Sequence, residues 1–205
     1  SQDFNFTIDD IKFDFENRLE LSSLSGIVKK KDSIISFENS KMFFGNSNLN
    51  GNLKLDYSNI VGSDIYSSEF INSIYMNLDI KDSNISSKDI GNIFTNFKTS
   101  YDESWTINTT VEGYVDDLFV KNFSLNNSRN TIELKSDIKN LFQDNYLLAI
   151  NILNFDIDSK EIDKVFPNFF GTILPSSLKT FGRFKMDGKI GFKSDNISSR
   201  FNLIT

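Results

Sequence analysis

Residues 76–97 read MNLDIKDSNISSKDIGNIFTNF, and residues 148–169 read LAINILNFDIDSKEIDKVFPNF. Aligned without a gap at an offset of 72 residues, the two stretches are identical at eight of 22 positions. Shared composition accounts for about two such matches, which is far fewer than are observed. The chain therefore contains an internal repeat, and the physical content of this repeat predicts the fold.

Each copy of the repeat begins as a strand with one apolar face. Hydrophobic residues occupy every second position, with polar residues mostly between them: Met76, Leu78 and Ile80 in the first copy, and Leu148, Ile150 and Ile152 in the second. A period of two is typical of a half-buried β-strand.

The period then changes to that of an amphipathic helix. The apolar residues stand at i, i+3, i+4 and i+7: Ile90, Ile93, Phe94 and Phe97, then Ile162, Val165, Phe166 and Phe169. Ser86 and Asp158 occupy the N-cap positions, and a carboxylate three residues later predicts a capping box in each copy. We expect helices over 86–97 and 158–169, the second ended by Pro167. Helices of two or three turns are too short to stand alone and must lie on a sheet.

Composition excludes several classes of function. The 205 residues include 21 Phe but no Cys and no His. The chain therefore has no disulfide framework, thiol nucleophile, Ser-His-Asp triad or histidine metal site, and we expect no cofactor. The net charge of −6 argues against binding nucleic acid.

The two ends of the chain both read as strands. Phe4-Asn5-Phe6-Thr7-Ile8 follows the first residues directly, and residues 201–205 (FNLIT) also alternate. There is no apolar run of 18 residues that could form a membrane-spanning helix. We therefore expect an internal piece of a longer protein, with its targeting and anchoring elements elsewhere.

The remaining sequence predicts an antiparallel meander with short connections. In residues 4–15 the apolar parity changes at Asp9-Asp10, which predicts a bulge or tight turn. Gly45-Asn46 and Asn50-Gly51-Asn52 are expected to interrupt the hairpin-rich block, and the Asn50-Gly51 step predicts a primed turn. Residues 29–32 predict a charged turn. The units are a hairpin-rich block over 1–75, repeat unit A over 76–147, and an incomplete unit B over 148–205.

Acidic clusters are the main candidates for a polar site. They are Asp9-Asp10, Asp116-Asp117, and Asp156 with Asp158 and Glu161. None matches a calcium-binding motif, and strand-end turns and helix caps explain them. Paired carboxylates could hydrolyse glycosides, but no cleft signal accompanies them. The six Asn-X-Ser/Thr sequons are consistent with coincidence in an Asn-rich chain.

The apolar strand faces allow two interpretations. They could form the packed core of an ordinary β-sandwich. Alternatively, one-faced sheets could stack end to end and curl into an apolar channel that is only partly covered. A repeat of 70 to 80 residues, with strands at both ends of the chain, favours an elongated array. The apolar face of such an array must be covered either by a second sheet or by a bound apolar molecule.

Three stretches support a family resemblance: residues 84–90 (NISSKDI), residues 111–113 (VEG) followed by 120–125 (VKNFSL), and residues 174–184 (LPSSLKTFGRF) leading to Gly188. Over roughly residues 24–205 the chain resembles the periplasmic part of the AsmA-like/TamB translocation and assembly module family, particularly its Bacteroidetes type. The resemblance implies a mainly β fold, an elongated antiparallel repeat that forms a curved, taco-like groove with a hydrophobic interior and short amphipathic helices.

The resemblance also implies a function. Members of the family are held at the inner membrane of Gram-negative bacteria and are thought to pass phospholipid through the periplasm to the outer membrane, with an Omp85-type barrel as partner. We expect a non-enzymatic segment of such a bridge, whose partners are phospholipid and, through a part of the chain not present here, the barrel. The expected groove-lining residues are Leu53, Leu55, Met76, Leu78, Ile80, Ile107, Val111, Leu148, Ile150, Ile152, Phe184, Met186, Phe201 and Leu203. The alternatives are a scaffold for outer-membrane protein assembly by edge-strand pairing, and a purely structural β-repeat.

Overall fold

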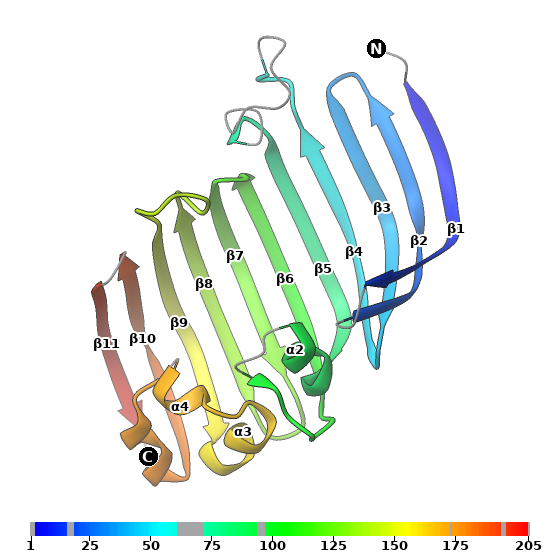
Figure 1. The fold of residues 1–205 in the computed structure, drawn as a ribbon. Helices are drawn as coiled ribbons and strands as arrows, with labels where there is room; N and C mark the ends of the chain where they lie inside the picture. Colours follow the sequence, from blue (N-terminus) through cyan, green and yellow to red (C-terminus); the bar gives the residue numbers. More distant parts are fainter. Residues whose placement is uncertain are drawn as a thin grey trace.

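The computed structural model describes residues 3–15, 19–60, 72–93, 97–172, 174–193 and 196–204 (Figure 1). It consists mainly of one antiparallel sheet of eleven strands. The strands are β1 (Phe4–Phe15), β2 (Leu19–Lys31), β3 (Ile34–Phe44), β4 (Ser47–Asp56), β5 (Tyr75–Ser86), β6 (Ser104–Tyr114), β7 (Asp117–Asn126), β8 (Thr131–Lys139), β9 (Leu147–Asp158), β10 (Arg183–Lys193) and β11 (Asn196–Ile204).

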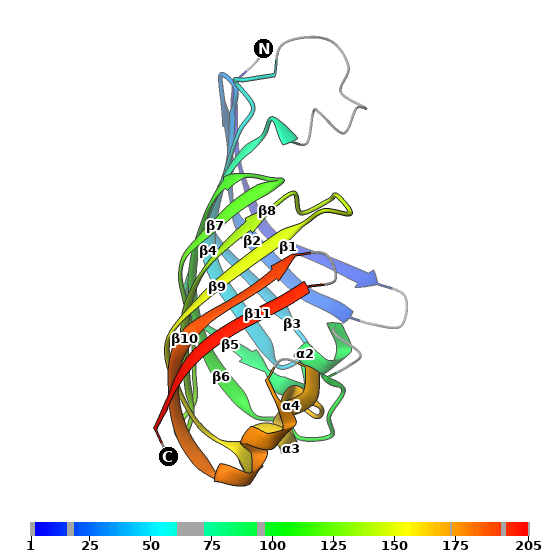
Figure 2. The same ribbon diagram turned by 90° about the vertical axis from the view of Figure 1, so that its left-hand side faces the viewer.

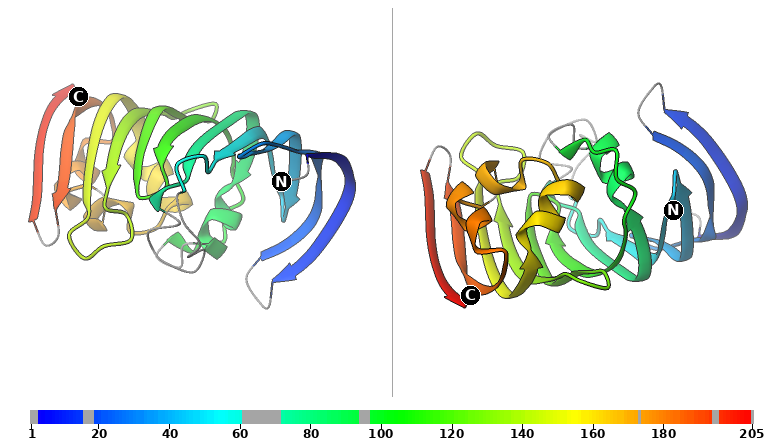
Figure 3. Two further views of the ribbon diagram at one scale, coloured as in Figure 1. Left: turned by 90° about the horizontal axis from the view of Figure 1, so that it is seen from above. Right: turned by 90° about the horizontal axis from the view of Figure 1, so that it is seen from below.

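The order of strands in the sheet is their order in the sequence. Each strand pairs only with the strands before and after it, so β1 and β11 are the two edges and the sheet is open. The sheet is twisted and curved, and it has a concave face (Figures 2 and 3). The mainly β, elongated antiparallel fold expected from the sequence is confirmed, as is its curved groove.

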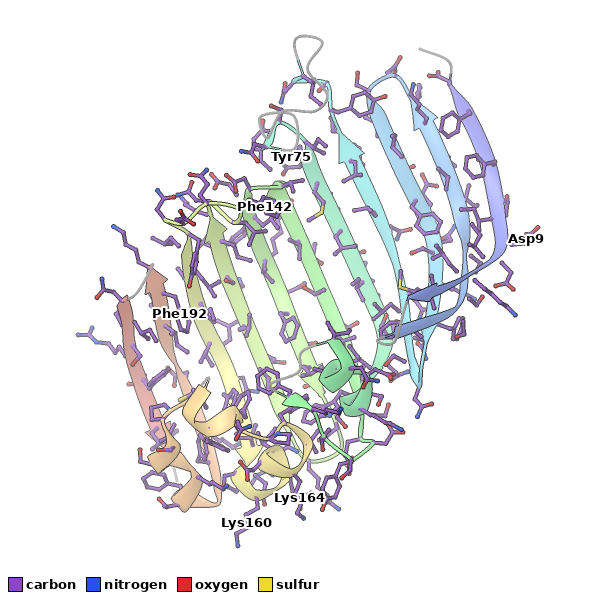
Figure 4. All side chains as sticks on the ribbon, viewed as in Figure 1. Asp9, Tyr75, Phe142, Lys160, Lys164 and Phe192 are labelled. Atoms are coloured by element: carbon purple, nitrogen blue, oxygen red, sulfur yellow. The ribbon has the colours of Figure 1, made fainter. Side chains whose placement is uncertain are left out.

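Short helices cover one end of the concave face. They are α2 (Ser87–Ile93), α3 (Ser159–Val165), the distorted turn α4 (Phe169–Thr172) and the 3₁₀ helix η2 (Ser176–Phe181). All lie toward the same ends of the strands (Figure 2). Figure 4 shows Lys160 and Lys164 of α3 at this end, and Tyr75 and Phe142 at the opposite end. The main hydrophobic core lies between these helices and the sheet, where Trp105 and Ile162 are fully buried.

The two copies of the repeat have the same structure. Each is a long strand followed directly by a helix, β5–α2 and β9–α3. Each strand carries a bulge at the same position, after Ile80 in β5 and after Ile152 in β9. The bulge restores the apolar parity, so that Ile85 and Ile157 point toward the helices, where they belong to the core.

An identical serine anchors each helix to the loop that follows it. The Ser87 hydroxyl donates a hydrogen bond to the carbonyl of Tyr101 at 2.8 Å, and the Ser159 hydroxyl donates to the carbonyl of Lys179 at 2.9 Å. The backbone N–H of each serine also donates to the end of the same loop. Both serines are fully buried. These bonds fix the short helices on the sheet, although the sequence indicated only that the serines were repeated.

The helix starts agree only in part with the predicted capping boxes. Asp158 is the N-cap of α3 and accepts bonds from two backbone N–H groups, and the Ser86 hydroxyl accepts from the N–H of Lys88. The second part of each prediction, that the carboxylate three residues later accepts a hydrogen bond from the N-cap backbone N–H, is wrong. Asp89 accepts instead from Asn46 N–H and the Ser47 hydroxyl, which joins α2 to the β3–β4 turn. Glu161 forms ion pairs with basic side chains.

The helix lengths also differ from expectation. The second helix ends earlier than predicted, at Val165, and Pro167 lies just beyond it; α2 is described as far as Ile93. Ile93, placed in the apolar stripe by its spacing, is 44% exposed. Phe94, in the same predicted stripe, lies outside the described residues.

Two predicted turns lie elsewhere. Asn50-Gly51 is in the middle of β4, because Gly51 is needed where the neighbouring strand passes close: a Cβ there would lie 2.4 Å from the Asp79 carbonyl oxygen. The other expected break, Gly45-Asn46, is the turn between β3 and β4. Residues 29–31 continue β2, and the turn is at 32–33. The bulge predicted at Asp9-Asp10 is confirmed by the register shift between Ile8 and Ile11.

Candidate functional site

The strand register determines which side chains share a face, because directly paired residues of antiparallel strands point to the same side. Leu53 of β4 pairs with Leu78 of β5, and Leu78 pairs with Val111 of β6. Such pairs can be followed across the whole sheet. Ile107 lies on the same face as Val111 and packs against the core that includes the helices. This helix-bearing concave side is called the inner face.

The register places all fourteen expected groove residues on the inner face. The link from β6 to β9 runs through Val111, Val120, Ser136 and Ile150, each paired with the next. Ile150 and Leu148 pair with inner-face residues of β10, and Leu203 of β11 pairs with Met186. The fourteen residues therefore lie on one continuous surface that extends over eight strands, from β4 to β11.

The inner face carries no charged residue from β3 to β11 among the positions that the register assigns to it. Its members there are hydrophobic except for Ser40, Ser47, Gly51, Ser83, Thr109, Gly113, Ser136, Gly188 and Ser199. The outer face is charged and carries ion pairs such as Glu112–Lys121 and Asp156–Arg183. The two faces of the sheet therefore suit opposite environments, one apolar and one aqueous.

Coverage of the inner face changes along the strands. Close to the helices, Ile152, Phe184 and Met186 are buried. Toward the other end of the strands, side chains such as Leu78, Val111 and Leu148 are only half-buried, because none of the described helices lies over them. On the edge strand Leu203 is 38% exposed. We call the half-buried part, formed by Leu53, Leu55, Met76, Leu78, Val111, Val120, Ile138 and Leu148, the open trough.

An apolar chamber lies where the helices cover the inner face. Its volume is about 390 Å³, and all of its lining residues are hydrophobic: Ile85, Ile90, Phe97, Ile107, Phe123, Leu125, Ile132, Leu134, Ile150, Ile152, Phe155, Phe166, Phe169, Leu174 and Ile190. Aromatic pairs such as Phe155–Phe169, with ring centroids 5.9 Å apart, form part of its wall. Leu134 of β8 and Ile150 of β9 line the chamber. Ile138 and Leu148 of the open trough lie on the same two strands, farther from the helices, so the two spaces adjoin.

The sequence contained a signal for several inner-face residues that were not among the fourteen. Leu118, Val120, Phe123 and Leu125 of β7 alternate before and after a bulge, and Ile132, Leu134 and Ile138 of β8 alternate too. What the sequence could not supply was the register, which shows that these strands face the same way as β5 and β9.

The acidic residues have structural roles. Asp116 is buried and accepts bonds from the Phe142 N–H at 3.0 Å and the Gln143 side chain at 2.9 Å, which hold the β8–β9 loop. Asp156 pairs with Arg183 and Lys185 on the outer face. Across the described ranges, no cluster of three or more acidic side chains could hold a metal ion.

The shifted pKa values belong to groups outside the inner face. Hydrogen bonds from Lys29 and Ser36 hold the pKa of Glu38 below its usual value. Asp79 accepts a hydrogen bond from Lys81 and raises the pKa of that ammonium group. The electrostatic features therefore lie away from the apolar surface that forms the candidate site.

Comparison of the chain with family models, curated proteins and solved structures gives no match. In the part of the chain that the structure describes, none of the helices has the length and apolar character needed to cross a membrane.

Proposed function

We propose that this chain is a non-enzymatic segment of a lipid conduit, in which phospholipid acyl chains lie along the open trough. The observation that carries the proposal is an inner face without charged residues over nine strands, part of which is only half-buried among the described residues. Monomeric soluble proteins rarely expose contiguous apolar surface on this scale unless it contacts another apolar molecule.

The physical driving force is the transfer of hydrocarbon out of water. Each methylene buried against the trough contributes about 0.8 kcal/mol, so a few carbons suffice to hold a chain without polar recognition. The absence of fixed polar contacts also suits movement, because a chain can slide from one strand to the next without breaking hydrogen bonds. The nine strands without inner-face charge, spaced about 4.8 Å apart, give a path of roughly 38 Å. Headgroups would stay in water at the open side.

The resemblance to the AsmA-like/TamB family extends this proposal to a cellular setting. The segment would belong to a bridge in the periplasm of a Gram-negative bacterium, anchored at the inner membrane and partnered by an Omp85-family barrel at the outer membrane. The curved groove, hydrophobic inside and charged outside, supports this assignment.

A second candidate function is a scaffold that guides outer-membrane proteins through edge-strand pairing. Exposed hydrophobic side chains on β11 favour it, since Ile197 is 70% exposed and Ile204 is 65% exposed. An extended segment of a client protein could add to such an edge.

Native mass spectrometry of the purified chain, after incubation with bacterial phospholipid vesicles and their removal, tests the conduit directly. Wild type should retain phospholipid. Leu78→Asp, which places a charge in the open trough, should reduce the lipid-bound fraction at least tenfold. Asn122→Asp adds the same charge on the outer face of nearby β7 and should leave lipid retention unchanged.

The result distinguishes the candidates. A lipid-free wild-type chain, or a folded Leu78→Asp variant that retains as much lipid as wild type, refutes the conduit. In that case, capture of an unfolded outer-membrane barrel protein by the same variant would support the scaffold. Failure to capture such a client would leave the purely structural repeat.

A further inference from the structure

The chamber under the helices has a size that selects among apolar ligands. An apolar cavity of about 150 Å³ holds one benzene molecule, which has six carbon atoms. By the same ratio the chamber, at about 390 Å³, holds about 15 carbon atoms. This capacity fits one hydrocarbon chain and is too small for the two chains of a phospholipid.

The lining of the chamber excludes polar groups. All of its lining side chains are hydrophobic, and Ile90 of α2 and Phe169 of α4 form part of the lining. A charged or hydrogen-bonding headgroup would lose its hydration there without gaining a partner. The polar end of a ligand must therefore remain at the boundary with the open trough, and only the hydrocarbon part can enter.

One hydroxyl marks this boundary. Ser136 lies on the inner face of β8, paired with Val120 and Ile150, two residues along the strand from Leu134 of the chamber wall. It is only 5% exposed, and its hydroxyl has no hydrogen-bond partner among the described residues. Thr109, the other hydroxyl on this face in β6–β9, donates to the Asn122 carbonyl at 2.9 Å. A buried hydroxyl without a partner is unfavourable, and the carbonyl oxygen of a ligand could accept its hydrogen bond.

We infer that the chamber binds a single acyl chain of up to about 15 carbons, with the carbonyl end of the chain at Ser136 and its methyl end under α2 and the segment Phe166–Phe169 that follows α3. The inference rests on the proposed function, since it assigns one part of the same apolar surface to one chain of the transported lipid. It adds a fixed resting position to a trough along which chains otherwise slide.

A series of sodium alkanoates from about 8 to 18 carbons, titrated calorimetrically below their micelle concentrations, tests the inference. For wild type the affinity should rise about fourfold per added carbon, equivalent to about 0.8 kcal/mol per methylene. The rise should become shallower near 15 carbons, when the chamber is full. Ser136→Ala should lower the affinity of the chains that fit by about tenfold or more, the range for one hydrogen bond to a charged carboxylate.

Filling the chamber provides the decisive variants. Phe123→Trp, with Ile107→Phe as a second substitution if the first does not fold, should move the change of slope one or two carbons shorter. Phe37→Trp makes the same change on the inner face of β3, away from the chamber, and should leave the slope unchanged. Circular dichroism confirms that each variant folds.

Two results would overturn the inference: a constant increment up to about 18 carbons in every folded variant, or an equal effect of Phe37→Trp. Phospholipid retention in the vesicle experiment is a separate measurement. If retention persists while the change of slope is missing, the chamber assignment fails and the conduit stands. If wild type retains no phospholipid, the proposed function fails first.

Discussion

The pair of repeated serines leads to a quantitative prediction about what holds the helices on the sheet. The Ser87 hydroxyl makes two hydrogen bonds: it donates to the Tyr101 carbonyl at 2.8 Å and accepts from the Glu103 N–H at 3.0 Å. The Ser159 hydroxyl makes one, to the Lys179 carbonyl at 2.9 Å. Each buried hydrogen bond has a net worth of about 1 kcal/mol. Ser87→Ala should therefore lower the free energy of unfolding by about 2 kcal/mol, and Ser159→Ala by about 1 kcal/mol.

The measurement is urea unfolding followed by the fluorescence of the single tryptophan, Trp105, which is fully buried beside Phe166 in the same core. Ser22→Ala is the matched control. Its hydroxyl also donates to a backbone carbonyl, that of Phe43 at 3.0 Å, but the bond is exposed and water can replace it. The control should change the free energy of unfolding by less than about 0.5 kcal/mol. If Ser87→Ala and Ser22→Ala destabilise the protein equally, the reasoning about the buried anchor is wrong.

Three further predictions follow from single side chains. Asp158→Ala should destabilise the protein by about 1 kcal/mol, because the N-cap of α3 loses its side-chain acceptor; urea unfolding would measure this, and an unchanged midpoint would contradict it. Gly113→Ala should cost about 1–3 kcal/mol, because φ is +133° and a Cβ would lie 2.3 Å from the Asp117 carbonyl oxygen; equal thermal midpoints for variant and wild type would refute this. Lys29→Met should raise the pKa of Glu38 toward its usual value. Since that pKa is lowered in the folded state, its contribution to stability is lost as pH falls, and the variant should lack this acid sensitivity; a carboxyl carbon titration by NMR with an unshifted midpoint would exclude the effect.

Local patterns in the sequence predicted the strands and the direction of their side chains well. Alternation in residues 76–80 and 148–152 gave the correct parity, since a period of two has one structural meaning when one face is apolar. The helix positions followed in the same way from a change of period. The Asp9-Asp10 bulge was visible because the apolar parity changes across it.

Features that depend on neighbours distant in the sequence could not be predicted. Asn50-Gly51 has the composition of a hairpin turn, but the close approach of β5 explains the glycine. Asp89 has the spacing of a capping box, but its carboxylate instead accepts hydrogen bonds from Asn46 and Ser47, which belong to a turn distant in the sequence. The chamber depends on how helices and strands from both repeats meet, so neither repeat alone indicates its presence.

The sequential strand order has a consequence for how long such a structure can be. Every strand has its hydrogen-bond partners directly before and after it in the chain, so inserting or deleting a hairpin leaves all other pairings intact. The repeat recurs every four strands, from β5 to β9, and four strands span about 19 Å. Gene duplication can therefore lengthen or shorten the sheet in steps of about 19 Å by adding or removing whole units, with no change to the units that remain.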